Sequence, residues 1–337
     1  MTIPASELDS HAAAIPSDVG AADATKVVGR SPTQLAIARF RKDKLSMTAF
    51  AICVLYAVGG IAAPILVKLG VLKTEKFNQD LLNISLGGIP NGSLGGISWS
   101  HPLGVEPGTG RDVLSRIALG TTYSLAIALT ACVLTIVIGA VLGIISGFSG
   151  GFVDSAVGRI IDLTLSFPST LMLLALSGMA VTFLREDLHI SNRDQANGLY
   201  VILILAGFGW PPIARVVRGQ VLSLREREFV DAARLLGASR ARLYFKEILP
   251  NLWAPLLVYF TLLLPAYVSA EAAFSYLGVG IKPPTPTLGN ILNDSVAYAE
   301  SDFIFFFFPA FMIAVIVISF NLFGDGIRDA LDPKSSQ

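Results

Sequence analysis

The chain has 337 residues, of which 53% are hydrophobic and 15% charged, whereas an ordinary soluble domain carries about a quarter charged residues. This composition excludes a soluble globular domain and indicates a membrane protein. The formal net charge is zero, so no basic field of the whole chain indicates a nucleic-acid partner.

The N-terminal third of the chain divides into three predicted segments. Residues 1–30 are rich in Ala, Ser, Asp and Pro without apolar periodicity, which predicts a disordered cytoplasmic tail. Residues 31–69 combine an amphipathic segment with a first membrane span. Residues 70–115 are turn-rich, as in LGGIPNGSLGGISWSHPLG, and predict an extracytoplasmic loop. The remaining spans fall within residues 116–334, which are predicted to form the core of the membrane domain.

Six stretches of the chain are apolar over the length that a membrane helix needs. A helix rises about 1.5 Å per residue, so about 20 residues cross a hydrocarbon core of about 30 Å. We therefore expect an all-α, polytopic integral membrane protein with spans at 46–67, 119–146, 160–184, 199–217, 253–280 and 303–323. If the N-terminus is cytoplasmic, 17 of the 25 Lys and Arg residues fall in inner segments and 8 in outer ones. The positive-inside rule then predicts that both termini are cytoplasmic.

The segment 218–251, between the fourth and fifth spans, is cationic and has helical periodicity. Apolar residues recur at helical spacing on both sides of Gly237, first at Phe229, Ala232, Ala233 and Leu236, then at Ala241, Tyr244, Phe245 and Ile248. This pattern predicts helix, turn and helix, with Ser239 as the second N-cap and Pro250 as the end. The hairpin could lie on anionic lipid of the inner leaflet. It could also dock on a protein partner and present the small residues Ala232 and Ala233 to it.

Two acidic residues fall inside predicted spans, and each has two open interpretations. A charge at mid-membrane costs about 2.5–3.5 kcal/mol on insertion scales, so Asp162 and Glu271 should face protein or water. They could be structural partners of Arg159, Arg215 or Arg218, or they could line a translocation path. We expect no metal site and no catalytic residue, because Cys53 and Cys132 are isolated and the histidines are far apart in sequence.

The stretch DAARLLGASRARLYFKEILPN, residues 231–251, resembles the "EAA" loop of permease subunits of ATP-binding-cassette importers. The family pattern is Glu-Ala-Ala, three residues, Gly, and a run that ends in Leu-Pro. The matching positions have the family's spacing, with Asp in place of Glu, and are Asp231, Ala232, Ala233, Gly237, Leu249 and Pro250.

Further motifs extend this resemblance over most of residues 35–334, in the order found in C-type permeases of dipeptide and oligopeptide importers. HPLG and GRDVLSR precede the second span, although Val105-Glu106 replaces the family's Thr-Asp and the connection is one residue longer. GGFVDSAVGRIIDLTLSFP starts at Gly150. EAAFSYLGVGIKPPTPTLG starts at Glu271, and NLFGDGIRDALDPK starts at Asn321.

The resemblance implies the type I importer permease fold in the plasma membrane of a prokaryote. It also implies a second homologous permease subunit, two ATPase subunits and an extracytoplasmic binding protein as partners, besides membrane lipid. Residues 116–334 would be the permease core, and Asp231 to Pro250 would couple it to the ATPase. The chain has no GxxxxGK[ST] loop, so we expect ATP and Mg²⁺ to be bound by the partner ATPases and this subunit not to be an enzyme.

The resemblance leaves the solute open. Relatives of this type carry dipeptides, longer peptides, glutathione, or nickel and its chelates.

Two other classes of protein remain as alternatives. A stand-alone secondary transporter commonly has inverted repeats, and no convincing repeat is visible. A membrane enzyme needs a nucleophile and a base, or a metal set, within the spans.

Overall fold

The computed structural model describes residues 32–92 and 94–331, so the predicted tail at 1–30 lies outside the described residues. The fold is all-α apart from one two-residue antiparallel pair, β1 (Leu82–Asn83) with β2 (Ile89–Pro90). Six helices of the described residues are long and apolar enough to cross a membrane, as predicted. They are α2 (Lys44–Lys68), α3 (Val113–Ser149), α5 (Ser169–Glu186), α6 (Arg193–Leu224), the continuous segment Arg240–Tyr276, and α11 (Phe303–Leu331).

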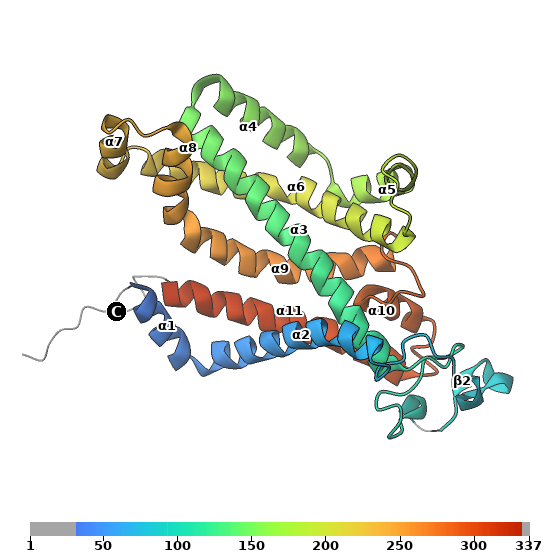
Figure 1. The fold of residues 1–337 in the computed structure, drawn as a ribbon. Helices are drawn as coiled ribbons and strands as arrows, with labels where there is room; N and C mark the ends of the chain where they lie inside the picture. The colour runs from blue at the N-terminus through green and yellow to red at the C-terminus, as the bar shows by residue number, and fades with distance from the viewer. Residues whose placement is uncertain (1–31, 93, 332–337) are drawn as a thin grey trace, which may run out of the picture.

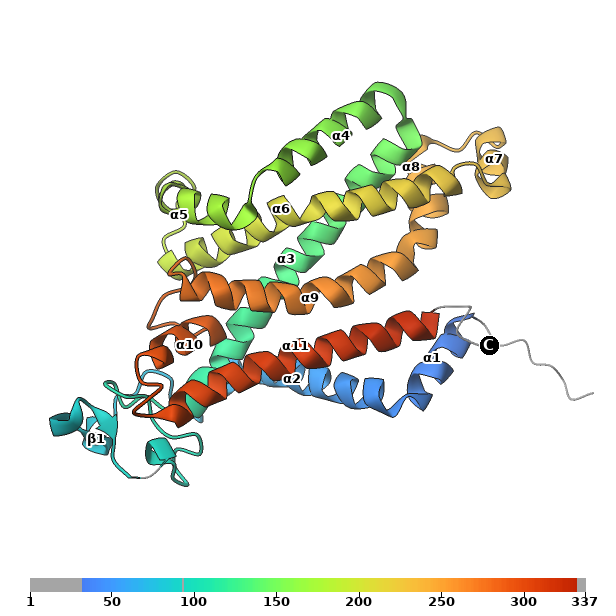
Figure 2. The same cartoon turned by 180° about the vertical axis from the view of Figure 1, so that it is seen from behind.

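Shorter helices gather at the two ends of this bundle. At one end lie α1 (Pro32–Lys42), α7 (Glu228–Leu235), α8 (Arg240–Arg242) and the last turns of α11 (Figure 1). At the other end lie α10 (Leu288–Val296) and the segment that carries β1 and β2 (Figure 2). The predicted orientation assigns the first end to the cytoplasm and the second to the outside.

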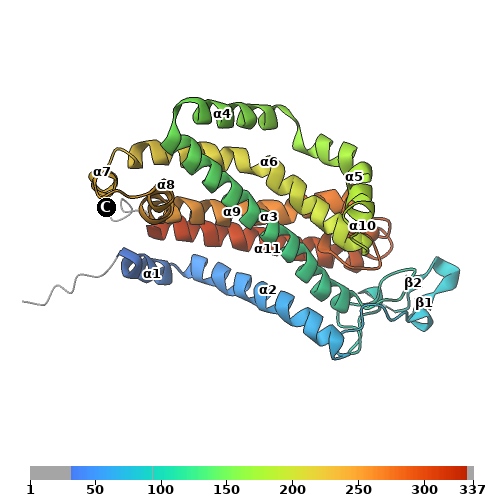
Figure 3. The same ribbon diagram turned by 45° about the horizontal axis from the view of Figure 1, so that its top comes forward.

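The third predicted span is displaced from 160–184. The chain leaves helical geometry at Phe167, which is extended, and Pro168 then precedes α5. Proline disfavours a helical conformation for the residue before it, which explains the break. A separate helix, α4 (Gly151–Ser166), runs along α6 and is followed by α5 (Figure 3). By length and composition the candidate span is α5, and Asp162 precedes it on α4.

Helix α3 crosses the bundle obliquely and packs closely on α6 (Figures 1 and 2). Gly139, Gly143 and Gly147 are four residues apart, so they line one side of α3. A Cβ atom placed on Gly143 would lie 2.8 Å from the Val217 Cβ atom, and those on the other two glycines would lie equally close to Ile213 and Val221. Small residues at this spacing allow membrane helices to approach, which fixes α3 against α6.

The segment before α3 is an ordered cap, defined here as residues 70–92 and 94–112. Glu106 holds Arg111 by two hydrogen bonds of 2.6 and 3.1 Å. Arg116, in the first turn of α3, is fully buried, with its Nε atom 3.7 Å from the same carboxylate and an Nη atom 4.0 Å from Asp294 on α10. These charges connect the cap to α3 and α10.

Candidate coupling site

The segment between α6 and α9 (Trp253–Tyr276) forms the predicted hairpin of two helices. Helix α7 ends at Leu235, and Gly237 follows with φ of 76°, a left-handed conformation that other residues adopt only at a cost. The Ser239 hydroxyl then accepts a hydrogen bond from the Arg242 N–H at 3.3 Å and caps α8. The helix–turn–helix prediction is confirmed, with Gly237 at the corner.

The predicted end of the second helix at Pro250 is wrong. The chain continues from α8 as a π-helical turn, Leu243–Ile248, and a 3₁₀ turn, Leu249–Leu252, directly into α9. Pro250 is tolerated because it occupies the first turn of the 3₁₀ segment, where its missing N–H leaves no hydrogen bond unmade. The hairpin is thus joined to α9 without a loop.

The inner side of the hairpin packs on the end of α3. Val230, Ala233 and Leu243 are buried together against Phe148, and the Arg234 guanidinium lies 5.0 Å from the centre of the Phe148 ring. Ala233 is only 7% exposed. Its predicted place on the outer surface is therefore wrong, because its small side chain lets α7 approach Leu243 of the same hairpin.

The outer side of the hairpin is apolar and has no partner within the described residues. Leu235 and Leu236 are 90% and 82% exposed, and Phe229 is 40% exposed. Ala232 is exposed as well, and Asp231 forms an exposed ion pair of 3.0 Å with Arg234. We call Phe229, Ala232, Leu235 and Leu236 the apolar tip. Leu235 was not among the residues predicted from the sequence, although an apolar pair directly before a helix-ending glycine is a visible signal.

The base of the hairpin is anchored in the bundle. Ile248, Leu252 and Leu256 are buried against Ile213, Val217 and Val221 of α6, and Leu249 packs at the edge of the same cluster. Pro250 is exposed. A displacement of the apolar tip must therefore move α6 and α9 or break this cluster, since packed interiors deform little.

Two ion pairs tie α4 to α6 near this end. Asp162 pairs with Arg215 at 2.6 Å, and both side chains are more than half exposed. Asp154 pairs with Arg218 at 2.5 Å through two hydrogen bonds and is partly buried. The Arg218 hydrogen bond lowers the pKa of Asp154 to about 2. Asp162 thus has one of the three structural partners that were predicted.

Glu271 lies in the interior of this chain. It is 1% exposed, and its carboxylate accepts hydrogen bonds from the Ser124 hydroxyl at 2.6 Å and the Ser275 hydroxyl at 2.9 Å. The Ser124 oxygen in turn accepts the Leu288 N–H at the start of α10. This network joins α3, α9 and α10 and favours the structural interpretation. A contact of Asp162 or Glu271 with solute stays a prediction.

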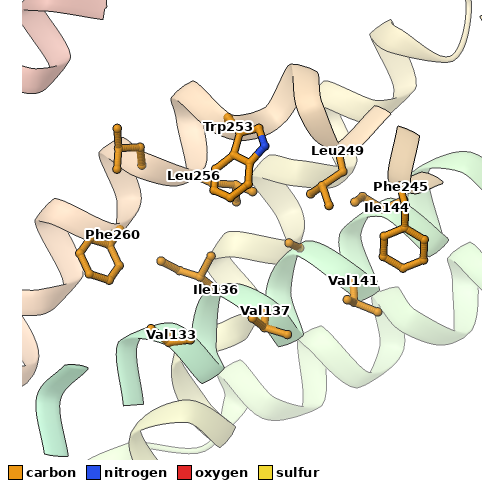
Figure 4. Close-up of a pocket in the computed structure, with 12 residues that line it drawn as sticks. Val133, Ile136, Val137, Val141, Ile144, Phe245, Leu249, Trp253, Leu256 and Phe260 are labelled. Carbon is orange, nitrogen blue, oxygen red and sulfur yellow. The ribbon is translucent and has the colours of Figure 1, made fainter. Parts of the chain in front are cut away.

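A pocket close to the hairpin is lined by apolar side chains. It has a volume of about 480 Å³ and lies between α3 and the Phe245–Phe260 stretch. Figure 4 shows Val137 and Val141 of α3 on one side and Trp253 and Leu256 on the other. The lining offers no charged group to a polar solute. Within residues 32–92 and 94–331, no group of three or more His, Cys, Asp or Glu side chains could hold a metal ion.

Comparison with known proteins identifies a family and several similar proteins. Residues 139–337 match the family described as binding-protein-dependent transport system inner membrane component. The oligopeptide transport system permease protein OppC of Bacillus subtilis is 36% identical over 95% of this chain and 96% of its own. The dipeptide transport system permease protein DppC of Alkalihalophilus pseudofirmus is 34% identical over 90% of each chain. The glutathione transport system permease protein GsiD of Escherichia coli O6:K15:H31 is 36% identical over 88% of each.

A solved structure supports the fold. A chain of the inward-facing MetNI methionine ABC transporter matches 65% of this chain and 97% of its own, with a TM-score of 0.50 and 21% identity. The six apolar helices and the family match together indicate a multi-pass protein of the inner membrane. Since the family match covers more than half of the sequence and the relatives match nearly all of it, the chain belongs to the binding-protein-dependent transport system inner membrane components.

Proposed function

We propose that this chain is the transmembrane permease subunit of an ATP-driven peptide importer, and that its α7–α8 hairpin docks on an ATPase subunit. The observation that carries the proposal is the apolar tip, which is exposed on a hairpin anchored in α3, α6 and α9. An apolar surface of this kind is suited to a protein groove, and the buried base transmits its movement to the spans.

The proposed assembly contains a second, homologous permease subunit, two ATPase subunits and an extracytoplasmic binding protein. ATP and Mg²⁺ are held by the ATPases, so this subunit has no catalytic residue of its own. The residues proposed for coupling have different positions in the hairpin; they are Asp231, Ala232, Ala233, Gly237, Leu249 and Pro250. Asp231 and Ala232 lie on its surface, Ala233 and Gly237 shape it, and Leu249 and Pro250 join it to α9.

The proposed solutes are dipeptides and oligopeptides. The names of two relatives refer to oligopeptide and dipeptide transport, and that of a third to glutathione, which is itself a tripeptide. Glutathione is therefore the second candidate solute. All three names refer to short peptides, and a short peptide normally carries a free carboxylate. The permease must therefore transport a solute with this group.

Reconstitution tests the transport function directly. Vesicles that hold both permease subunits, the ATPases and the binding protein should accumulate labelled trialanine only with ATP, and the permease pair alone should be inactive. Accumulation by the pair alone, driven by an ion gradient, would identify a secondary transporter instead.

The docking role has its own test in the apolar tip. Leu235→Gln with Leu236→Gln should detach the ATPase in a pull-down and abolish stimulation of ATP hydrolysis, because each leucine contributes about 1.5–3 kcal/mol when fully buried. Ile84→Gln, at an 82% exposed position of the cap, is the matched control and should retain the ATPase. Full ATPase retention in the leucine variant would refute docking through this tip.

A further inference from the structure

A second kind of pocket lies at the outer end of the bundle, between the end of α5, the start of α6 and the turn after α9. Its volume is about 240 Å³. Arg185, Arg193 and Lys282 line it together, one from each of these three segments. The large apolar pocket near the coupling hairpin has no such group.

The three cations stand where the positive-inside rule disfavours them. Outer segments of this chain carry 8 of its 25 Lys and Arg residues, and three of these 8 gather at this one pocket. Among the described residues none of the three side chains has an ion pair or a hydrogen bond. Asp194, close to them in sequence, is held by the Thr285 hydroxyl at 2.5 Å and lines a different pocket. Glu186 and Asp187 follow Arg185 directly, but among the described residues no carboxylate lies within ion-pair distance of the three cations.

The pocket also contains a buried hydrogen-bond donor. Asn197 lines the same pocket, is 8% exposed, and its side-chain Nδ2 atom is buried without a hydrogen-bond partner among the described residues. A buried unpaired donor costs about 1–3 kcal/mol, so such a group indicates a missing acceptor. The neighbouring Tyr200 hydroxyl already donates to the Leu173 carbonyl at 2.6 Å and does not compete for it.

We propose that this pocket binds the terminal carboxylate of the peptide as it enters from the binding protein. Arg185, Arg193 and Lys282 attract and neutralise the carboxylate, and Asn197 donates a hydrogen bond to it. Arginine suits the role because its guanidinium presents paired donors to a planar carboxylate. The assignment rests on the proposed peptide transport and specifies how the solute is oriented at the outer entrance.

The test compares trialanine with trialanine amide in the reconstituted complete importer, with the binding protein in excess. In Arg193→Ala and in Asn197→Leu, the ratio of the import rates of acid and amide should fall about tenfold, because a charge-assisted hydrogen bond is lost. Lys68→Ala, an exposed cation at the outer end of α2, is the matched control and should keep the ratio. An unchanged ratio in both pocket variants, or an equal loss for both peptides, would overturn the proposal.

Two further measurements distinguish a carboxylate site from a lipid site and from a failure of transport itself. Binding of the two peptides to the purified permease pair tests the pocket even if the importer carries neither, an outcome that would contradict the proposed function alone. Equal affinities for acid and amide would then overturn the carboxylate site. Import is also measured in vesicles with and without phosphatidylglycerol. If the effect of Arg193→Ala appears only with this lipid, the pocket holds a lipid phosphate and the proposal fails.

Discussion

At the scale of the residue, helical spacing predicts local neighbours better than distant ones. Arg159 is three residues from Asp162 and was a natural partner on one helix face. The structure instead brings Arg215 to Asp162 at 2.6 Å, across two helices. The sequence could name Arg215 among the candidates but could not choose it, because the choice depends on how α4 lies on α6. The burial of Glu271 likewise depends on Ser124, which is 147 positions away.

Glu271 allows structural and solute-binding roles to be separated by two substitutions. Glu271→Gln keeps the size. Its amide oxygen can still accept from one hydroxyl, and its NH2 group can donate to the oxygen of the other, so the melting temperature of the complex should stay near that of the unaltered protein. Glu271→Ala removes the acceptor of the Ser124 and Ser275 hydroxyl protons and should cost about 1–3 kcal/mol. Both are measured by thermal unfolding in detergent, together with import of peptides with free and blocked N-termini. A changed N-terminal preference in the Gln variant would assign Glu271 to the solute.

Asp154 predicts a dependence of stability on acid pH. Its pKa is lowered from 3.8 to about 2 by the Arg218 hydrogen bond, so the folded state favours the charged carboxylate. The stabilisation is fully present above pH 3.8 and is lost as the pH falls through about 2. The melting temperature of the unaltered protein should therefore approach that of Asp154→Asn in this range. A constant difference between the two proteins down to pH 2 would contradict the assignment.

At the scale of the element, apolar length predicted six spans because a membrane helix needs a long apolar run. The boundaries were less predictable. Pro168 breaks the third predicted span, whereas Pro250, Pro211 and Pro265 lie within continuous helical segments. A proline therefore marks a candidate helix boundary. Whether the helix ends there depends on the residues that pack around it. The Gly237 turn was predictable, because a left-handed corner is a local property of the chain.

The close packing of α3 on α6 can be tested with a pair of glycines. A methyl group on Gly143 would lie 2.8 Å from Val217, while one on Gly219 of α6 would meet nothing within 4 Å. Gly143→Ala should destabilise the protein by about 1–3 kcal/mol through overpacking. Gly219→Ala should be neutral or stabilise by about 0.5–1 kcal/mol, because alanine is the better helix former. Chemical unfolding of both variants checks this, and equal stability would refute the close contact.

At the scale of the whole molecule, the two ends of the bundle carry different structures. The cap lies at one end, and the α7–α8 hairpin lies at the other (Figures 1 and 2). The pocket lined by Arg185, Arg193 and Lys282 is at the end of the cap. Charge counts predicted this orientation, since it follows from the distribution of Lys and Arg along the sequence. The ordered contacts of the cap were not predictable, because they depend on Glu106, Arg111, Arg116 and Asp294 meeting in space.

Thiol labelling checks the orientation in cells. Cys53 and Cys132 are buried, so the unaltered chain should give little background. Ser85→Cys in the cap should react with a membrane-impermeant maleimide in intact spheroplasts. Ala241→Cys in the hairpin should react only after permeabilisation. Labelling of Ala241→Cys in sealed spheroplasts would reverse the assigned topology.

Helix α3 connects the two ends of the molecule without a break. It starts at the Asp112 cap beside the outer charge network and ends at Phe148 and Ser149 beside the hairpin, as one helix of 37 residues. At 1.5 Å per residue its length is about 55 Å, so a rotation of about 10° around one end shifts the other by about 10 Å. In the proposed importer, the tilt of this one helix would connect the arrival of solute on the outside with the closure of the ATPase on the inside.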